Sequence, residues 1–159
     1  MTIKYIGFKP NPQGQTHRTP PAIFNKLNSI FQFTVDAAAD ASNALLPRYW
    51  TEEQDALKQD WSGERVFCNP PFGKAKDFLQ KAGTACRCVM LLPLNCLTAK
   101  YYHAVGGADW IIIPEGRINY LTKDGQATKA MMLGTCFLIW GWLTDDEVEK
   151  LGGLTYQLY

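Results

Sequence analysis

A short apolar run that ends in two prolines constrains the fold of this chain more than any other feature. The segment RVFCNPPFG, Arg65–Gly73, is apolar up to Cys68 and then continues as Asn69 and a Pro-Pro pair. Proline lacks the N–H that a central strand must donate to its neighbour. We therefore predict a buried strand that ends at Cys68, with the tetrapeptide at 69–72 forming a turn directly after it.

Segments with strand and helix patterns alternate along the rest of the chain. Strands are predicted at 31–35, 65–68, 87–93, 109–114 and 136–142, and helices after Thr19, at 74–84, at 98–105 and after Thr144, with a loop and one further helix between 37 and 59. Thr19 is the expected N-cap of the first helix. Several strands are apolar throughout, which is typical of a sheet covered on both faces. The alternation favours an open α/β sheet whose ligands bind beyond the carboxyl ends of the strands.

Length and charge favour one compact domain without a general attraction for nucleic acid. The chain has 159 residues, of which 47% are hydrophobic, enough for one core but not for two ordinary domains. We predict an extended arm at 1–18, one domain at 19–159 and a short hairpin insertion near 117–134. The 16 Lys and Arg residues nearly balance the 15 Asp and Glu residues, so an anionic partner must be held by a local patch.

The cysteines and the lack of long apolar runs favour an intracellular protein. Five cysteines, an odd number, lie mostly in apolar segments, which is typical of reduced, packed thiols. The Cys86-x-Cys88 pair has no second Cys or His pair at zinc spacing, so we expect no metal. The N-terminus has no leader pattern, and no apolar run reaches the length of about 20 residues that spans a bilayer. We expect a cytoplasmic protein without membrane contact.

The turn after the strand at 65–68 offers hydrogen-bond acceptors at the edge where such folds bind ligands. The side-chain oxygen of Asn69 and the carbonyl of Pro70 can together accept both hydrogens of one amino group. Holding an aryl amine in this way localises its lone pair and stabilises the positive charge that grows on nitrogen during attack. Phe72 would offer a face for a flat ring. The alternative is a turn that only ends a strand, with Phe72 in the core.

The motif CNPPFG at 68–73 resembles the [DN]PP[YF] motif of AdoMet-dependent amino-methyltransferases, and asparagine in first place favours adenine N6. Further segments in the same order resemble the small phage-type Dam family of DNA N6-adenine methyltransferases across most of the chain. They are TPP at 19–21, FTVDAAAD at 33–40 with Asn43 beyond it, DALKQDW at 55–61, VMLLPLNCLTAKYYHAV at 89–105 and PEGRINYL at 114–121. The resemblance implies a Rossmann-like AdoMet-dependent methyltransferase fold, with a mostly parallel central sheet flanked by helices. The catalytic residues it implies are Asn69, Pro70, Pro71 and Phe72.

The same resemblance implies a set of residues around the cofactor AdoMet (S-adenosyl-L-methionine). In the family, the Thr-Pro segment borders its methionine end, the end of the first strand holds its amino-acid part, and an acidic residue before an aromatic one accepts from its adenine. The residues so implied are Thr19, Pro20, Asp36, Ala37, Asp60 and Trp61. Asp36 can pair with the cofactor ammonium, and Asp60 can accept from an adenine N–H, with Asp55 as the competing choice.

The chain departs from the wider class at two places. DAAAD follows the first strand where larger enzymes carry a Gly-x-Gly loop, so small alanines must permit the close approach of the cofactor. The segment ATKAMMLGT is rich in methionine where more Pro and Ser is usual. Met131 and Met132 are interpreted as core or contact residues rather than chemical ones.

A base inside duplex DNA cannot reach such a turn, so adenine methylation implies that the target nucleotide is flipped out. Basic residues could offset that cost by contacting phosphates, although each one is equally an ordinary surface charge. The candidates are Lys74, Lys76, Arg117, Lys123 and Lys129. The chain is too short for a separate recognition domain, so base contacts must come from short loops, the arm at 1–18 or a second subunit in a homodimer. His17 and His103 have no partner pattern and are not expected to be catalytic.

Three hypotheses about function follow from these patterns. The leading one is a site-specific DNA adenine-N6 methyltransferase of a phage or prophage, which acts on double-stranded DNA and shields it from restriction; the family name implies GATC as its site. The second keeps the chemistry but methylates adenine in RNA or a glutamine amide in protein. The third is an inactive relative that binds DNA or AdoMet without transferring a methyl group.

Overall fold

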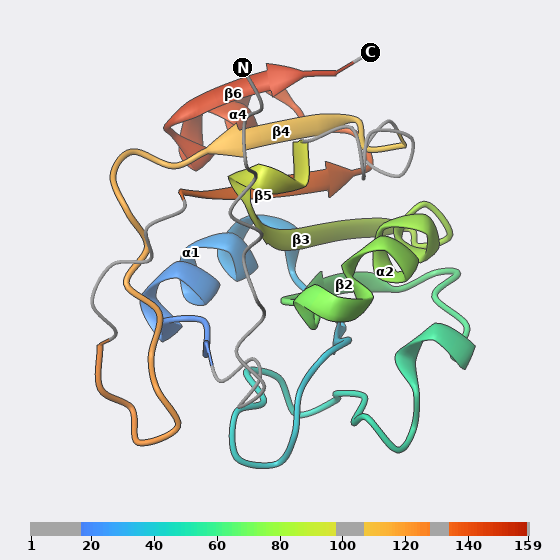
Figure 1. Ribbon diagram of the computed structural model, residues 1–159. Helices are drawn as coiled ribbons and strands as arrows, with labels where there is room; N and C mark the ends of the chain where they lie inside the picture. Colours follow the sequence, from blue (N-terminus) through green and yellow to red (C-terminus); the bar gives the residue numbers. More distant parts are fainter. Residues whose placement is uncertain (1–16, 98–106, 128–133, 159) are drawn as a thin grey trace, which may run out of the picture.

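The computed structural model describes residues 17–97, 107–127 and 134–158, which form a sheet with helices on both faces (Figure 1). The sheet has six strands in the order β1-β2-β3-β5-β4-β6. The strands are β1 (Val35–Asp36), β2 (Arg65–Cys68), β3 (Arg87–Pro93), β4 (Trp110–Ile113), β5 (Thr135–Trp140) and β6 (Leu154–Gln157). The helices are α1 (Pro21–Phe31), α2 (Ala75–Ala82) and α4 (Asp145–Leu151), with 3-10 turns η1 (Ala56–Lys58), η2 (Phe72–Lys74) and η3 (Leu94–Leu97).

Strand direction changes across this sheet. β1, β2 and β3 are parallel, whereas β5 runs antiparallel to β3 and β4, and β6 runs antiparallel to β4. The α/β class is confirmed, but the prediction of a mostly parallel sheet is wrong, because the sheet is mixed. All six residues of β5 are buried, as is the centre of β3. A strand buried on both faces has the same apolar pattern in either direction, so the pattern could not reveal the reversal.

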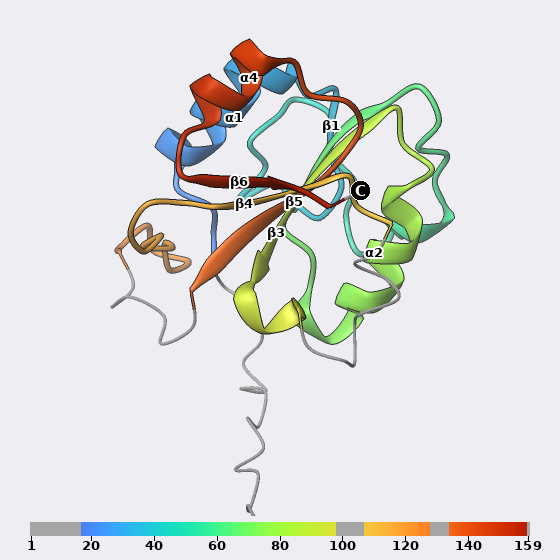
Figure 2. The same cartoon turned by 90° about the horizontal axis from the view of Figure 1, so that it is seen from above.

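Different helices cover the two faces of the sheet, as Figure 2 shows from above. α2 lies on one face, and α1 and α4 lie side by side on the other. The side chains of β3 alternate between these layers: Met90 packs in one core cluster with Phe78 of α2, and Leu91 in another with Phe24 of α1. The sheet therefore has a core on each face.

The predicted cap of the first helix is wrong by one residue. Pro20 is the N-cap of α1, and no side chain caps this helix. The N–H groups of Ile23 and Phe24 both donate to the Pro20 carbonyl, at 3.0 and 3.1 Å. Because Pro20 and Pro21 have no N–H, the helix start contains fewer donors that need a partner. The Thr19 hydroxyl is therefore not required as a cap.

The start of α4 is as predicted. The Thr144 hydroxyl accepts from the Glu147 N–H, and the Glu147 carboxylate accepts from the Thr144 N–H at 2.8 Å, which completes a capping box. Two other expectations fail, because 37–59 contains the 3-10 turn η1 instead of a helix, and β6 follows the strand that was expected to be the last. The helix predicted at 98–105 lies outside the described residues.

The thiols of the described chain are packed rather than linked. Cys68, Cys88 and Cys136 are buried and Cys86 is exposed, and none of these four forms a disulfide within the described residues. Burial raises the pKa of the Cys68 and Cys88 thiols, which keeps them protonated and unreactive. Within the described ranges no group of three His, Cys, Asp or Glu side chains could hold a metal ion. None of the helices seen there is long and apolar enough to cross a membrane.

Candidate active site

The carboxyl ends of β1 and β2 place two of the predicted site residues next to each other. The register pairs Asp36 with Phe67, and the Ala37 N–H donates to the Phe67 carbonyl at 2.9 Å. Asn69 comes directly after β2. Because neighbouring strands lie about 4.8 Å apart, these residues share one edge of the sheet. We call this edge the strand rim and define it as residues 36–38 and 69–71.

Asp36 is a buried carboxylate without a cationic partner among the described ion pairs. It is 3% exposed and accepts two long hydrogen bonds, from the N–H groups of Ala38 at 3.3 Å and Leu45 at 3.5 Å. Burial raises the pKa of the carboxyl to about 6, although those two N–H groups oppose the shift. A positively charged ligand group would stabilise this carboxylate, so its surroundings fit the ammonium group of AdoMet.

Asn69 is held in one orientation by the chain that precedes α1. Its amide nitrogen donates to the His17 carbonyl at 3.0 Å and to the Thr19 hydroxyl at 3.2 Å. These two bonds use both N–H hydrogens of the amide. Within the described chain no donor reaches the side-chain oxygen of Asn69, so this oxygen is left to accept from a ligand.

The two prolines of the turn differ in what their carbonyls bind. The Pro71 carbonyl accepts from the Lys74 N–H at 2.8 Å as η2 begins. Among the described residues no N–H donates to the Pro70 carbonyl. The acceptors that the turn itself offers are therefore the side-chain oxygen of Asn69 and the Pro70 carbonyl.

The segment 17–19 contacts three other parts of the chain. Arg18 forms an antiparallel bridge with Leu121, in which each N–H donates to the other carbonyl at 2.9 Å. The Arg18 guanidinium donates to the Ser42 carbonyl at 3.0 Å and to the Ser42 hydroxyl at 2.9 Å, in the loop after β1. The segment thus connects the turn at 121–127, the loop after β1 and Asn69.

Trp61 lies in the core rather than at the surface. It is 0% exposed, stacks on Trp50 with ring centroids 5.9 Å apart and donates its indole N–H to the Ala56 carbonyl at 2.8 Å. In this place the indole supports the connection between β1 and β2. A direct contact of Trp61 with a cofactor stays a prediction.

Asp60 and Asp55, the two candidates for the adenine contact, differ in their partners. Asp60 is exposed and accepts from the Ser62 N–H at 2.8 Å, a bond that lowers the pKa of its carboxyl. Asp55 accepts from the Leu57 N–H at 3.3 Å and forms an ion pair with Lys58 at 3.1 Å. Asp60 is thus the acid with no cation at its carboxylate in the described ion pairs. The described contacts join neither acid to the strand rim.

The remaining predicted residues flank the turn and the 117–127 segment. Phe72 begins η2, but its side chain lies outside the described part of the structure, so stacking on a base stays a prediction. Lys74, Lys76, Arg117 and Lys123 are all exposed. Lys74 lies 3.8 Å from the Glu52 carboxylate, and both side chains are largely exposed, so this pair is weak. Lys129, Met131 and Met132 lie outside the described residues.

Sequence reasoning missed the partners of Asn69. His17 was expected to have no catalytic part, and it contributes a backbone carbonyl rather than its ring. Thr19 was expected to cap a helix and border the cofactor, and its hydroxyl accepts from Asn69 instead of capping. A backbone carbonyl has no signature in a sequence, whereas the two prolines after Thr19 were a signal that no cap was needed.

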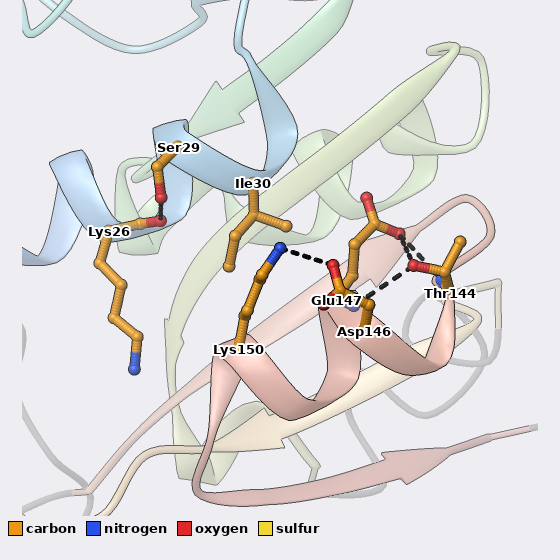
Figure 3. A pocket seen from close by; sticks show the side chains of 7 residues that line it. All are labelled: Lys26, Ser29, Ile30, Thr144, Asp146, Glu147 and Lys150. Atoms are coloured by element: carbon orange, nitrogen blue, oxygen red, sulfur yellow. Dashed lines mark hydrogen bonds and ion pairs between the residues drawn. The ribbon is translucent and has the colours of Figure 1, made fainter.

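A groove lies between α1 and α4 (Figure 3). It is lined by Lys26, Ser29, Ile30, Thr144, Asp146, Glu147 and Lys150. None of these residues belongs to the strand rim, and the charged groups that line the groove are partnered within the protein. The groove therefore has no part in the candidate site.

A comparison with known families identifies the class of protein that this fold and site define. The family of the DNA N-6-adenine-methyltransferases (Dam) matches residues 8–152, which is most of the chain. The chain belongs to this family, and is therefore a methyltransferase by descent. Methyltransferases of this family use AdoMet as the methyl donor.

Two relatives show how far the similarity extends. The DNA N-6-adenine-methyltransferase of Escherichia phage T1 is 25% identical over 154 residues, which cover 83% of this chain and 65% of the phage protein. The protein named "Putative methyltransferase YfdM" of Escherichia coli (strain K12) is 40% identical over 67 residues, which cover 37% of this chain and 72% of that protein. The chain thus spans about two thirds of the phage relative.

Proposed function

We propose that the protein transfers a methyl group from AdoMet to the N6 amino group of adenine at specific sites in double-stranded DNA, with GATC as the site that the family name suggests. The observation that carries the proposal is the orientation of Asn69. Its amide hydrogens are bound within the protein, and its oxygen remains as an acceptor beside the Pro70 carbonyl. The name of the phage T1 relative supports DNA adenine as the substrate.

The chemistry of the strand rim suits an amino group that is a poor nucleophile. The Asn69 oxygen and the Pro70 carbonyl accept the two N–H hydrogens of adenine N6, which draws the lone pair out of conjugation with the ring. The same oxygens stabilise the positive charge on nitrogen as the new bond forms. The proton then leaves to water, so no general base is required.

The cofactor supplies an electrophilic methyl group on a sulfonium. Asp36 binds the ammonium group at the end of β1, where the carboxylate is buried and the described ion pairs include no cation beside it. Ala37 lies beside it on the rim, and its small side chain permits a close approach. Thr19 and Pro20 border the methionine end, and Asp60, in front of Trp61, accepts from the adenine of the cofactor.

DNA binds with its target adenine flipped out of the duplex onto the strand rim, where Phe72 stacks on the base. Exposed Lys74 and Lys76 lie directly after the catalytic turn, and exposed Arg117 and Lys123 lie in the 117–127 segment that bridges to Arg18. These four cations contact phosphates and offset the cost of flipping. Base contacts come from the short loops, the arm or a second subunit of a homodimer.

The experiment that tests this proposal follows a labelled methyl group. The purified protein is incubated with labelled AdoMet and unmethylated duplex DNA, with RNA and protein as alternative acceptors, and the products are digested to nucleosides and amino acids. An adenine-free duplex is the matched control, because it keeps the phosphates and the cytosine amino groups. We expect label only in N6-methyladenine from adenine-containing DNA.

Two outcomes would contradict the proposal. Label in RNA or in glutamine, without label in DNA, would keep the chemistry and change the substrate. No label in any acceptor, although AdoMet binds, would indicate a protein that binds without catalysis.

A further inference from the structure

The orientation of the Asn69 amide is determined by its neighbours. An amide nitrogen and oxygen are hard to distinguish by shape alone, so the hydrogen-bond partners must decide between them. The His17 carbonyl can only accept, and it lies 3.0 Å from the Asn69 nitrogen. The nitrogen therefore faces the segment 17–19, and the oxygen faces the opposite side.

Of the two described hydrogen bonds that orient the Asn69 amide, only the one to Thr19 has a side chain as its acceptor. The Thr19 hydroxyl accepts from the second N–H of Asn69 at 3.2 Å, and the residue is 6% exposed. The His17 carbonyl belongs to the backbone and is present whatever the side chain at 17. Among the described side chains, Thr19 is therefore the one whose substitution would weaken the orientation of Asn69 without changing Asn69 itself.

The two residues that flank Thr19 in the sequence fix its backbone, and thereby the position of its hydroxyl. Arg18 is bridged to Leu121 through two backbone hydrogen bonds, and Pro20 is the N-cap of α1. Because Pro20 takes the N-cap place, the hydroxyl has no role in the helix. Its geometry serves Asn69 instead.

We propose that Thr19 is a positioning residue that keeps the Asn69 oxygen directed toward the target amine. The role rests on the function proposed above, in which that oxygen is an acceptor. Without the Thr19 acceptor, the side-chain amide is held by one hydrogen bond, and the last torsion of asparagine has a broad, roughly two-fold profile. A flipped amide would present N–H groups to the N–H groups of the target, and such a complex cannot react.

The test uses Thr19→Val, which keeps the shape of the side chain and removes the acceptor, and Thr19→Ser, which restores an acceptor. For Thr19→Val we expect the rate of methyl transfer at saturating AdoMet and DNA to fall about tenfold, in line with the loss of one orienting hydrogen bond. Because valine keeps the shape of the side chain that borders the methionine end, the dissociation constant for AdoMet should stay within about twofold. Thr19→Ser should recover most of the rate.

A second measurement does not depend on activity. The side-chain amide of Asn69 gives a pair of N–H signals in NMR spectra, which can be assigned because they are lost in Asn69→Ala. In Thr19→Val one of these signals should shift and its hydrogen should exchange faster with solvent. If the protein proves inactive on every acceptor, the proposed function fails, and this measurement still tests the contact.

Thr34→Val is the matched control. The Thr34 hydroxyl donates to the Glu64 carboxylate at 2.6 Å and accepts from the Arg65 N–H at 2.9 Å. Thr34 lies directly before the amino end of β1, whereas the strand rim lies at the carboxyl ends of β1 and β2. This variant removes comparable hydrogen bonds and should lose stability without losing rate at saturation in the folded protein.

Three results would overturn the proposal. The first is an unchanged rate and unchanged Asn69 signals in Thr19→Val. The second is a weaker affinity for AdoMet with a normal rate at saturation, which would limit Thr19 to its place beside the cofactor and leave it no part in orienting Asn69. The third is an equal loss of rate in Thr34→Val, which would indicate a general loss of structure.

Discussion

The strand rim and the groove between α1 and α4 differ in how their polar groups are partnered. In the groove, Lys150 pairs with Asp146, Glu147 with Arg87, and the Lys26 ammonium donates to a backbone carbonyl. At the strand rim, Asp36 is buried and has no cation in the described ion pairs, and no described donor binds the Asn69 oxygen.

This difference shows that a hollow is not by itself a site. The groove is concave, but its charges stabilise one another and leave little for a ligand. The rim is defined instead by polar groups whose best partners are absent from the described chain. Because buried polar groups are nearly always hydrogen-bonded in folded proteins, such groups at a strand end are a stronger sign of function than concavity.

The largest expected effect at the rim follows from Asn69→Ala. This change removes one of the two acceptors for the target amine, and the rate of methyl transfer should fall by about a thousandfold, as for the loss of a group that stabilises charge in a transition state. Binding of AdoMet should remain largely intact, because Asp36 is unchanged. Labelled transfer and equilibrium binding, measured on one preparation, check both parts. A near-normal rate would show that the two-acceptor mechanism is wrong.

A smaller effect is expected from Asp36→Asn, which keeps the shape of the side chain and removes its charge. The affinity for AdoMet should fall about ten- to hundredfold, since a charge-assisted hydrogen bond to the ammonium group is lost. Calorimetric titration measures this change. Asp60→Asn makes the same change at an exposed carboxylate and should reduce the affinity for AdoMet less than Asp36→Asn does. Equal affinities of Asp36→Asn and the unmodified protein would remove Asp36 from the cofactor site.

The pH dependence of stability sharpens the same point. The pKa of Asp36 is raised to about 6 from 3.8 by burial, so the folded protein binds this proton more tightly than the unfolded chain does. Stability from this group is therefore present below the unfolded pKa and is lost as pH rises through about 6. Between pH 5 and pH 7 the deprotonation of Asp36 should lower the free energy of unfolding by about 1 kcal/mol.

Denaturant unfolding at several pH values tests this expectation. Asp36→Asn is the control, because its free energy of unfolding should not fall between pH 5 and pH 7. Saturating AdoMet should reverse the trend, because the bound ammonium group favours the charged carboxylate. The same slope in both proteins would assign it to another group.

In the groove, the expected effects are confined to stability. Glu147→Gln weakens the pair with Arg87, whose nitrogen lies 3.0 Å from the carboxylate, with both side chains about one-fifth exposed at 21% and 19%. We expect a loss of about 1 kcal/mol in the free energy of unfolding and no change in the rate of methyl transfer at saturation. A loss of rate in the folded variant would mean that the groove has a part in function after all.

Much of the fold was predictable because its signals are local. The strand at 65–68 ends at the prolines, the helix after Thr144 has its capping box, and α2 begins soon after the turn. The direction of β5 was not predictable, since an apolar strand carries no mark of its direction. β1 also differs from its prediction: Phe31 ends α1 and the strand occupies Val35–Asp36 only.

The site was predictable to a similar degree. The motif predicts that Asn69 follows a buried strand, and the resemblance predicts that Asp36 ends the first one; the structure confirms both places, while the roles of the two residues stay predictions. The packing of Trp61 and the contact between Thr19 and Asn69 depend on residues that are about 10 and 50 positions apart in the sequence. No local pattern reports such contacts, which arise only when the chain folds.

The measurement that tests the central claim most directly is an NMR titration of the protein with AdoMet, followed by DNA. We predict that the backbone amide signals of Ala37 and Ala38 shift with AdoMet and that the side-chain amide signals of Asn69 shift further with DNA. The backbone amide signals of Ser29 and Lys150 in the groove should not move. Shifts confined to the groove, with the strand rim unaffected, would contradict the account.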